Sequence, residues 1–162
     1  MNKQFTFWGV ALLGAAFLVG GLLVIYLGFH SRGELTESLV NEKITGSDPA
    51  ILLTYEGARA PEGVEVPEVS VDTAQEAHDQ AMVIRTHTLS ITEGKTYTEM
   101  DREDPARATY ISSLTLQNSL HLAHIGLELS LFVIGTGVAF VGIGAGTLVL
   151  GLPLVRKVLA LK

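Results

Sequence analysis

Two long stretches without a charged side chain constrain this chain of 162 residues more than any other feature. Residues 8–29 contain no Asp, Glu, Lys or Arg, and neither do residues 129–155. About 20 apolar residues in an α-helix are enough to cross the roughly 30 Å hydrocarbon core of a bilayer. Both stretches exceed that length, and a small soluble chain has little core in which to bury two such helices. The sequence therefore predicts two transmembrane helices.

The charged residues are distributed unevenly around these stretches. The N-terminus carries Lys3 and the C-terminus carries Arg156, Lys157 and Lys162, with no acid at either end. The segment 31–119 contains 16 acidic and 7 basic residues, a net charge of −9. Because basic residues next to transmembrane helices are retained inside, we expect a protein of the bacterial cytoplasmic membrane with both termini cytoplasmic and the acidic segment outside. The negative charge also disfavours nucleic acid as a partner.

We expect a mostly α fold: a two-helix transmembrane hairpin with a helical extracytoplasmic domain between the spans. The first span is expected to be an uncleaved anchor, because it is longer than the apolar region of a usual signal peptide and no A-x-A-like site follows it. The predicted segments are an N-terminal transmembrane helix at 1–30, an acidic, mainly helical extracytoplasmic domain at 31–124, a C-terminal transmembrane helix at 125–155 and a basic cytoplasmic tail at 156–162.

The segment after the first span begins with a continuation of the same helix. Apolar residues at helical spacing occupy 35–44, and Gly33 predicts a kink or an interruption before them. Two prolines, a glycine and alternating valines in residues 58–71 then predict an extended loop with a short paired strand.

Two aspartates in the middle of the chain predict helix starts. Asp48 precedes Pro49, a pair that favours the first turn of a short helix. Asp72 and Gln75 match the spacing of a capping box, in which side chain and backbone at a helix start bond reciprocally. This second signal predicts a helix that runs to about Thr92.

The clearest helix start is Asp104 followed by Pro105. A capping residue followed by proline at the first helical position is favourable because proline lacks the N–H that would remain unbonded there. No proline follows until Pro153. We therefore expect one helix over about 105–151, continuous from an extracytoplasmic stalk into the membrane.

Glycines recur at intervals of seven residues in both apolar stretches. The first stretch contains the series Gly14, Gly21 and Gly28. The second stretch contains two series: Gly135 and Gly142 in one register, and Gly137, Gly144 and Gly151 in another. Seven residues are about two helical turns, so each series forms a stripe where two backbones can approach closely in lipid. The two registers lie about 200° apart around the helix, and one neighbour cannot cover both. We expect one stripe to pack on the first span and the other to face a second protein or a second copy; the alternative is that glycine is simply frequent in membrane helices.

A group of polar residues stands at the start of the second apolar stretch. His121, His124 and Glu128 follow i, i+3 and i+4 spacing, so neighbours share one face of a helix. Glu128 precedes Arg156 by about 42 Å of helix, which places Glu128 at the outer headgroups if Arg156 lies at the inner ones. Imidazole nitrogen and carboxylate oxygen suit zinc, copper or iron.

Helix geometry limits this group to part of a metal site. His121 and Glu128 lie about 10 Å apart along the axis, so one ion would use His124 with one of them and need further ligands. In a second interpretation the three residues are interfacial, solvated by headgroups, with Glu128 bonded to His124. A role in proton transfer or with a redox partner is the third. Two possibilities remain for a cofactor: a zinc or copper ion, or no ion bound by this chain alone.

Three other histidines do not complete the site in this interpretation. His30 would point away from the second span if Gly28 faces it, because the two differ by about 200° around the helix. His78 and His87 lie on opposite sides of their helix and do not form a pair.

The sequence contains none of the common catalytic motifs. There is no G-x-S-x-G, P-loop, H-E-x-x-H or dinucleotide-binding fingerprint, and no cysteine for a disulfide or a thiolate site. We therefore expect no catalytic activity of this chain itself.

One polar stretch matches a pattern found in other proteins. HTLSITEGKTYTEMDREDPARAT, residues 87–109, follows the order I-x-x-H, GKTY and DREDP-x-R when Ile84 is included, and NEKITGSDPA upstream is similar as well. The match, mainly in residues 84–109, resembles a family of actinobacterial two-span membrane proteins. Members of that family are often labelled aromatic ring-opening dioxygenases. The resemblance implies an actinobacterial or similar origin and a two-span layout.

These observations favour an accessory or scaffolding subunit of an integral membrane complex, without catalytic activity of its own. A respiratory, electron-transfer or membrane monooxygenase assembly is the expected host. The expected partners are the lipid bilayer and other integral membrane subunits, or further copies of this chain, contacted through the glycine stripes. The alternative is a metal-binding or metal-delivery subunit that uses His121, His124 and Glu128. A homo-oligomeric sensor or channel ranks last, because the spans offer no polar pore lining.

Overall fold

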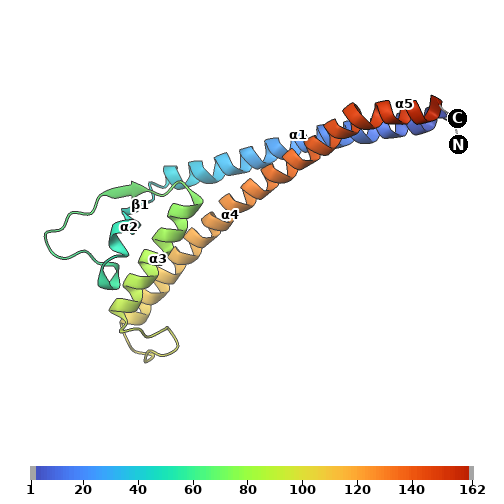
Figure 1. Ribbon diagram of the computed structural model, residues 1–162. Helices are drawn as coiled ribbons and strands as arrows, with labels where there is room; N and C mark the ends of the chain where they lie inside the picture. Colours follow the sequence, from blue (N-terminus) through green and yellow to red (C-terminus); the bar gives the residue numbers. More distant parts are fainter. Residues whose placement is uncertain (1–2, 161–162) are drawn as a thin grey trace. The chain divides into compact units, whose positions relative to one another are not determined.

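The computed structural model describes residues 3–160 and is mostly helical (Figure 1). The helices are α1 Lys3–Asn41, α2 Pro49–Leu52, η1 Glu56–Ala58, α3 Ala74–Ile91, α4 Ala106–Gly146, η2 Thr147–Gly151 and α5 Leu152–Ala160, and the strands are β1 Thr45–Ser47 and β2 Glu68–Ser70. Contacts divide the chain into two compact units. We call residues 1–32 and 129–162 the apolar unit and residues 33–128 the acidic unit. Lys162 of the predicted basic tail lies outside the described residues.

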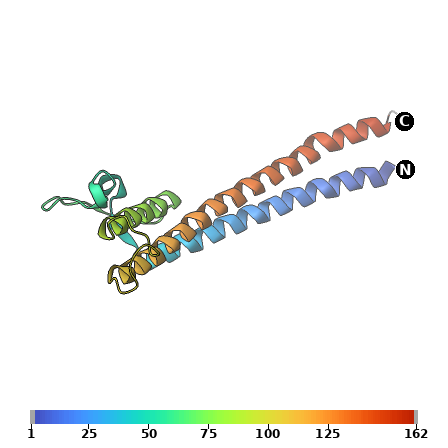
Figure 2. The same ribbon diagram turned by 90° about the horizontal axis from the view of Figure 1, so that it is seen from below.

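The apolar unit is built from two long apolar helical segments. Gln4–Asn41 and Ala106–Val158 contain runs long and apolar enough to cross a membrane, judged by length and composition. Within this unit the two segments lie side by side (Figure 2). Their large apolar side chains are mostly on the outside: Leu12 is 68% exposed, Val19 65% and Phe132 71%.

The second apolar helix does not end at the predicted position. It passes from α4 into the π-helical turn η2 and then into α5, which runs to Ala160 and includes Pro153. Proline lacks a backbone N–H, and its ring would clash with the carbonyl of residue 149, four positions earlier. A π turn widens the helix at that point, so the chain accommodates the proline where an end near residue 151 was expected.

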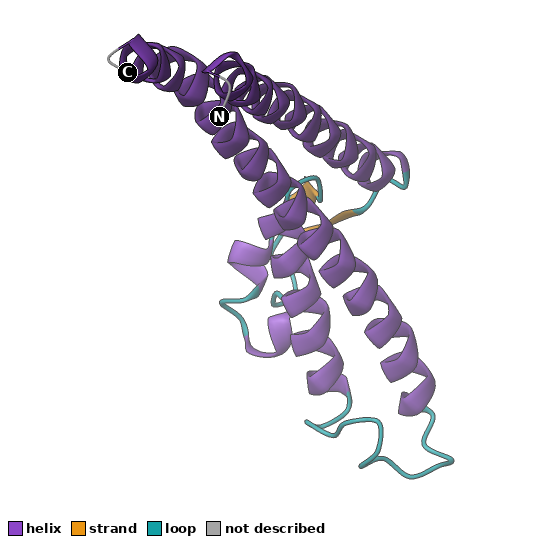
Figure 3. Ribbon diagram, turned by 90° about the vertical axis from the view of Figure 1, so that its right-hand side faces the viewer, coloured by secondary structure: helices purple, strands orange, loops and turns teal. Residues whose placement is uncertain are grey.

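The acidic unit packs α3 against the first half of α4 (Figures 1 and 3). One cluster of buried residues consists of Val71, Ala77, Ala81 and Leu120. A second consists of Leu39, Ala74 and Leu127, so the end of α1 contributes as well. Small alanines on α3 bring its axis close to α4, and leucines on α1 and α4 supply the buried apolar surface.

Strands β1 and β2 form an antiparallel pair in the same unit, with Gly46 opposite Val69. This confirms the short strand expected in residues 58–71. Helix α1 extends to Asn41, as expected, and it is not interrupted at Gly33. One glycine costs a helix about 1 kcal/mol relative to alanine, which is less than is needed to break it.

Helix α3 begins one residue later than the sequence suggested. Thr73, not Asp72, is the N-cap: its side chain accepts a hydrogen bond from the Glu76 N–H at 3.2 Å. The Glu76 carboxylate in turn accepts from the Thr73 N–H at 2.9 Å. The capping box therefore pairs Thr73 with Glu76, and the expected partner Gln75 instead donates to Asp79 at 2.8 Å.

The carboxylate of Glu76 is stabilised in its charged form by this cap. Burial would raise its pKa, but hydrogen bonds from Thr73 and Asp72 oppose that effect, and the pKa lies below its ordinary value of 4.5. The negative charge also sits at the positive end of the α3 dipole.

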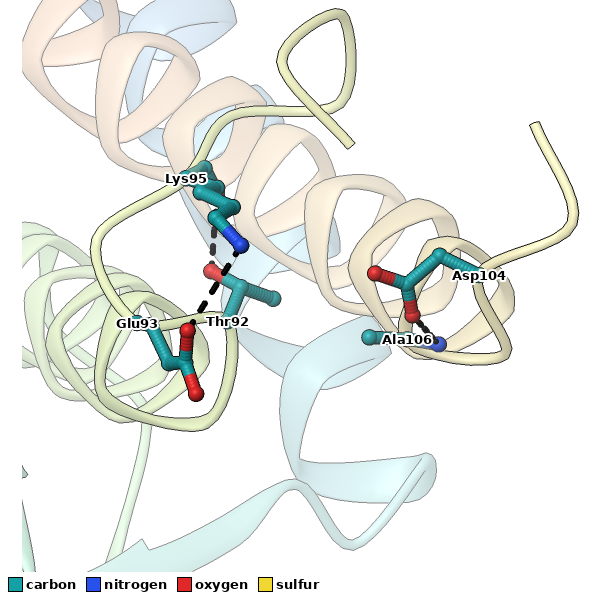
Figure 4. Close-up of polar contacts among 5 residues, drawn as sticks. All are labelled: Thr92, Glu93, Lys95, Asp104 and Ala106. Carbon is teal, nitrogen blue, oxygen red and sulfur yellow. Dashed lines mark hydrogen bonds and ion pairs between the residues drawn. The ribbon is translucent and has the colours of Figure 1, made fainter. Parts of the chain in front are cut away.

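The other two predicted helix starts are confirmed. Asp48 accepts a hydrogen bond from the Ala50 N–H at 2.9 Å, at the start of α2. Asp104 accepts one from the Ala106 N–H, also at 2.9 Å, at the start of α4 (Figure 4). Between α3 and α4 the chain turns sharply: Lys95 forms an ion pair with Glu93 at 3.5 Å, and its carbonyl accepts from the Thr92 hydroxyl at 2.8 Å (Figure 4).

Candidate functional site

The histidines of α4 face helix α3 within the acidic unit. His121 and His124 are half-buried, whereas Glu128 is exposed. The Nδ1 atom of His124 lies 2.9 Å from the carbonyl oxygen of Ala74, the first residue of α3. The structure therefore gives this nitrogen of His124 a backbone partner on a neighbouring helix, and Glu128 stands apart from the contact.

A third histidine, His78 of α3, meets the two histidines of α4. Its ring centre lies 5.2 Å from that of His124, with the planes at 45°. It lies 6.0 Å from the ring centre of His121, with the planes at 54°. Three imidazoles from two helices therefore gather at one place, and we call them the histidine cluster.

The hydrogen bond to Ala74 determines which nitrogen of His124 carries a proton. A carbonyl oxygen can only accept, so Nδ1 must be the donor. In a neutral imidazole the other nitrogen, Nε2, then keeps its lone pair. His124 thus offers a nitrogen that can take a proton or bind a metal ion, on a ring held by the backbone of α3.

The described residues do not already form a complete metal cage. Within residues 3–160, no three or more His, Asp or Glu side chains are arranged so that together they could hold an ion. His121, His124 and Glu128 therefore form at most part of a metal site. The side chain that packs against the two histidines is that of His78.

The partner role of His78 could have been recognised from its place on α3. Ala74, His78 and Ala81 follow i, i+4 and i+7 spacing, which puts them on one side of the helix. Ala74 and Ala81 are buried, so that side faces other helices. The missing information was which helix lies opposite, because α3 and α4 meet through contacts distant in sequence.

His30 belongs to the apolar unit and takes no part in the cluster. It is exposed and stacks on Tyr26, with ring centres 6.0 Å apart and planes at 6°. Gly28 is buried, and a Cβ added to it would lie 2.6 Å from Ile134 Cγ1 and 3.2 Å from Ser130 O. Gly28 thus faces the second apolar helix, which is the condition under which His30 was expected to point away from it.

The glycines of the apolar unit fall into two sets. We call a glycine filled if a Cβ added to it would meet other atoms within 4 Å, and open if it would meet none. In the filled set, a Cβ added at Gly21 would lie 2.7 Å from the carbonyl oxygen of Gly137. A Cβ at Gly144 would lie 2.7 Å from the carbonyl oxygen of Gly14. Each step of seven residues forward along α1 is matched by seven residues backward along α4, so the helices pack antiparallel with their backbones in contact.

Gly151 is a weaker member of the filled set. A Cβ there would lie 3.8 Å from side-chain atoms of Thr147 and Val10, which is ordinary van der Waals contact. The helix is already widened by η2 at this point, so the close approach seen at Gly144 does not continue to Gly151.

The open set contains the other glycine register of α4, Gly135 and Gly142, together with Gly146 and with Gly9 and Gly20 of α1. A Cβ added at Gly135, Gly142 or Gly146 would have no described atom within 4 Å. Gly135 and Gly142 are exposed. The sequence predicted that the two registers of the second helix face different neighbours, and the structure places Gly137 and Gly144 against α1 and leaves Gly135 and Gly142 uncovered.

The acidic unit also contains a small cavity beside a polar atom without a partner. Its volume is about 270 Å³, and its lining is mainly apolar: Leu39, Ile44, Thr45, Gln80, Ile84, Leu116, Ser119 and Leu120. The buried Oε1 atom of Gln80 has no hydrogen-bond partner among the described residues. An amide oxygen left unbonded in such a place weakens the fold.

Residues of the GKTY and DREDP-x-R motifs have a structural role at the start of α4. The guanidinium of Arg107 lies 3.8 Å above the Tyr97 ring and donates to the Met100 carbonyl at 2.8 Å. These contacts hold the connector against the helix. Among the described residues, Arg107 forms no ion pair with the nearby acids Asp101 and Glu103.

Comparison with known proteins gives no family model, no curated relative and no solved structure that matches this chain.

Proposed function

We propose that this chain is a two-span membrane protein that acts as an accessory or scaffolding subunit and joins other membrane helices through its open glycines. The observation that carries the proposal is the contrast between the two glycine registers of α4. Gly137 and Gly144 are in backbone contact with α1, while a Cβ added at Gly135 or Gly142 would meet no described atom within 4 Å. Glycines at seven-residue spacing provide a surface on which another helix can pack closely in lipid.

The exposed apolar side chains of the same unit support a location in the bilayer. Residues such as Leu12, Val19 and Phe132 are more than half exposed, and covering them with lipid or with other helices removes that surface from water. In this proposal α1 and α4 form a transmembrane hairpin with both termini in the cytoplasm. The acidic unit then lies outside, because the basic residues that flank the two apolar stretches at the chain ends are retained on the cytoplasmic side.

The resemblance of residues 84–109 supports the choice of host complex. A chain that resembles actinobacterial two-span proteins and carries no common catalytic motif fits a subunit that positions or stabilises others. A respiratory, electron-transfer or membrane monooxygenase assembly remains the proposed host. The acidic unit would then contact its outer face.

The open glycines can be tested with paired variants. Gly135→Leu and Gly142→Leu place side chains into open space, so the hairpin itself is expected to fold normally. The matched control is Gly9→Leu, the same change at another open position of the apolar unit. After extraction in mild detergent, the wild type and the control should run in native mass spectrometry as one complex larger than a single chain.

The two test variants should instead release the single chain. A wild-type protein that is extracted as a lone monomer would contradict the proposal. So would a Gly135→Leu/Gly142→Leu double variant that keeps the wild-type complex.

A further inference from the structure

We propose that His78 and His124 form a binding site for one divalent transition-metal ion, Cu²⁺ or Zn²⁺, which links α3 to α4. The proposal concerns only the acidic unit and does not depend on the role of the open glycines. It differs from the sequence-based hypothesis in its ligands, because the second imidazole comes from α3 and Glu128 takes no part.

The separation of the two rings fits a shared ion. A histidine nitrogen lies about 2.0–2.1 Å from zinc, and the ring centre lies roughly 1 Å beyond the nitrogen. Two imidazoles on one tetrahedral ion therefore have ring centres roughly 5 Å apart. The ring centres of His78 and His124 are 5.2 Å apart.

The ring of His124 is already held as a metal ligand would be. Histidines that bind metals usually donate their second ring N–H to a carbonyl or carboxylate, which fixes the tautomer and the orientation of the ring. His124 makes this bond through Nδ1 to the Ala74 carbonyl at 2.9 Å. Its Nε2 atom is left as the coordinating nitrogen.

The surroundings favour a cation with room for other ligands. The acidic unit contains all 17 acidic residues of the chain, and such a field raises the local concentration of cations. The half-buried His121 lies at the edge of the site, with its ring centre 6.0 Å from that of His78. Water completes the coordination in the proposed site, and the general order of affinities places Cu²⁺ above Zn²⁺.

Binding would couple the ion to the stability of the acidic unit. The two ligands lie on different helices and come together only in the folded chain. An ion that binds only the folded state shifts the unfolding equilibrium, by about 100-fold when its concentration is 100 times the dissociation constant. Metal should therefore slow the opening of α3 away from α4.

The test uses the full chain, purified in detergent through an affinity tag without histidines. Titration calorimetry with Cu²⁺ alone and with Zn²⁺ alone should give one ion per chain, with Cu²⁺ bound more tightly. Hydrogen exchange of α3 should become slower when the ion is added. A chain that takes up no ion at an equimolar ratio would overturn the proposal.

Three variants separate coordination from folding. His78→Ala and His124→Asn should each weaken binding by about tenfold or more. Asn is chosen at position 124 because its amide can still donate to the Ala74 carbonyl, so α3 keeps its contact while Nε2 is lost. His87→Ala is the control, since it removes a histidine from α3 outside the cluster and should leave binding unchanged.

The same titrations can contradict the proposed ligands. Unchanged affinity in His78→Ala or His124→Asn, with normal circular dichroism, would exclude them. An equal loss in His87→Ala would show that the ion binds histidines without a defined site. A chain that binds the ion yet runs as a lone monomer would support the metal site and contradict only the scaffolding function.

Discussion

The two units of this chain are built from opposite compositions. The acidic unit contains all 17 acids and 6 of the 11 basic residues, whereas the apolar unit contains no acid and the other 5 basic residues. Among residues 3–158, every buried apolar side chain belongs to the acidic unit. The apolar unit, which has the more hydrophobic sequence, is held together by glycines instead.

This difference fits the proposed location of the apolar unit in lipid and of the acidic unit in water. In water, burial of apolar side chains drives packing, and the acidic unit buries Leu127 and Val71 almost completely. In lipid that driving force is absent between helices, so close backbone contact at small residues has to hold them together. Gly21 and Gly137 provide such a contact in the apolar unit. One chain therefore combines two packing mechanisms, and each can be disrupted separately.

The largest expected effect comes from the core of the acidic unit. Leu127 is 0% exposed and packs with Leu39 and Ala74. Leu127→Ala should lower the free energy of unfolding of this unit by about 3–4 kcal/mol, because it removes buried surface and leaves a cavity. Hydrogen exchange of α3 measures the loss. The control, Leu122→Ala, changes a residue of the same helix that is 70% exposed.

Leu127→Ala also tests whether the two mechanisms are separate. Exchange should become faster in α3 and stay unchanged in residues 8–29 of α1. If hydrogen exchange became equally faster in both segments, the two units would unfold together, and their packing could not be disrupted separately.

The second effect comes from the filled glycines. Gly21→Leu should destabilise the contact between α1 and α4 in the apolar unit by about 2–3 kcal/mol. The atoms in its way are backbone atoms of Gly137 and Val141, which cannot move aside. Protection of residues 8–29 against hydrogen exchange in detergent should fall. Gly142→Leu, the control on the open register, should leave that protection at the wild-type level.

Local sequence signals predicted where the helices begin better than they predicted which helices contact one another. Asp48 and Asp104 were recognised as caps because a cap depends on the next few residues alone. The sequence DTAQE contains two overlapping capping boxes, and the structure uses Thr73 with Glu76 rather than Asp72 with Gln75. Of the two, only Thr73 with Glu76 has the Ser or Thr that a capping box usually places at the N-cap, so this pair could have been preferred from the sequence.

The contacts of the candidate sites depend on which helices become neighbours. The seven-residue spacing predicted two glycine stripes on the second apolar helix, but both have the same spacing, so the sequence did not say which one packs on α1. His78 was set aside because the only histidine considered with it was His87, on its own helix. Its true neighbours, His121 and His124, are more than 40 residues away and follow from the packing of α3 on α4.

A smaller effect, of opposite sign, is expected at the cavity of the acidic unit. Gln80→Met keeps the length of the side chain and removes the buried oxygen that has no partner. The free energy of unfolding should rise by about 1 kcal/mol. Gln80→Glu provides the contrast, because it places a charge against Leu39, Ile44 and Leu120 and should lower stability. A thermal melt of both variants measures the difference, and a less stable Gln80→Met would show that the amide contributes favourably.

The smallest effect is the pH dependence of the α3 cap, and it belongs to the acidic unit only. The pKa of Glu76 is lower in the folded chain than its ordinary value of 4.5, so the folded state prefers the charged carboxylate. This contribution to stability is complete above pH 4.5 and is lost as the pH falls through the lowered pKa of the folded state. Glu76→Gln should therefore be less stable than the wild type at neutral pH, and the difference should shrink on acidification. Glu65→Gln, in an exposed loop, corrects for the loss of one negative charge. A difference that stayed constant down to low pH would show that the charge of Glu76 does not contribute to the cap.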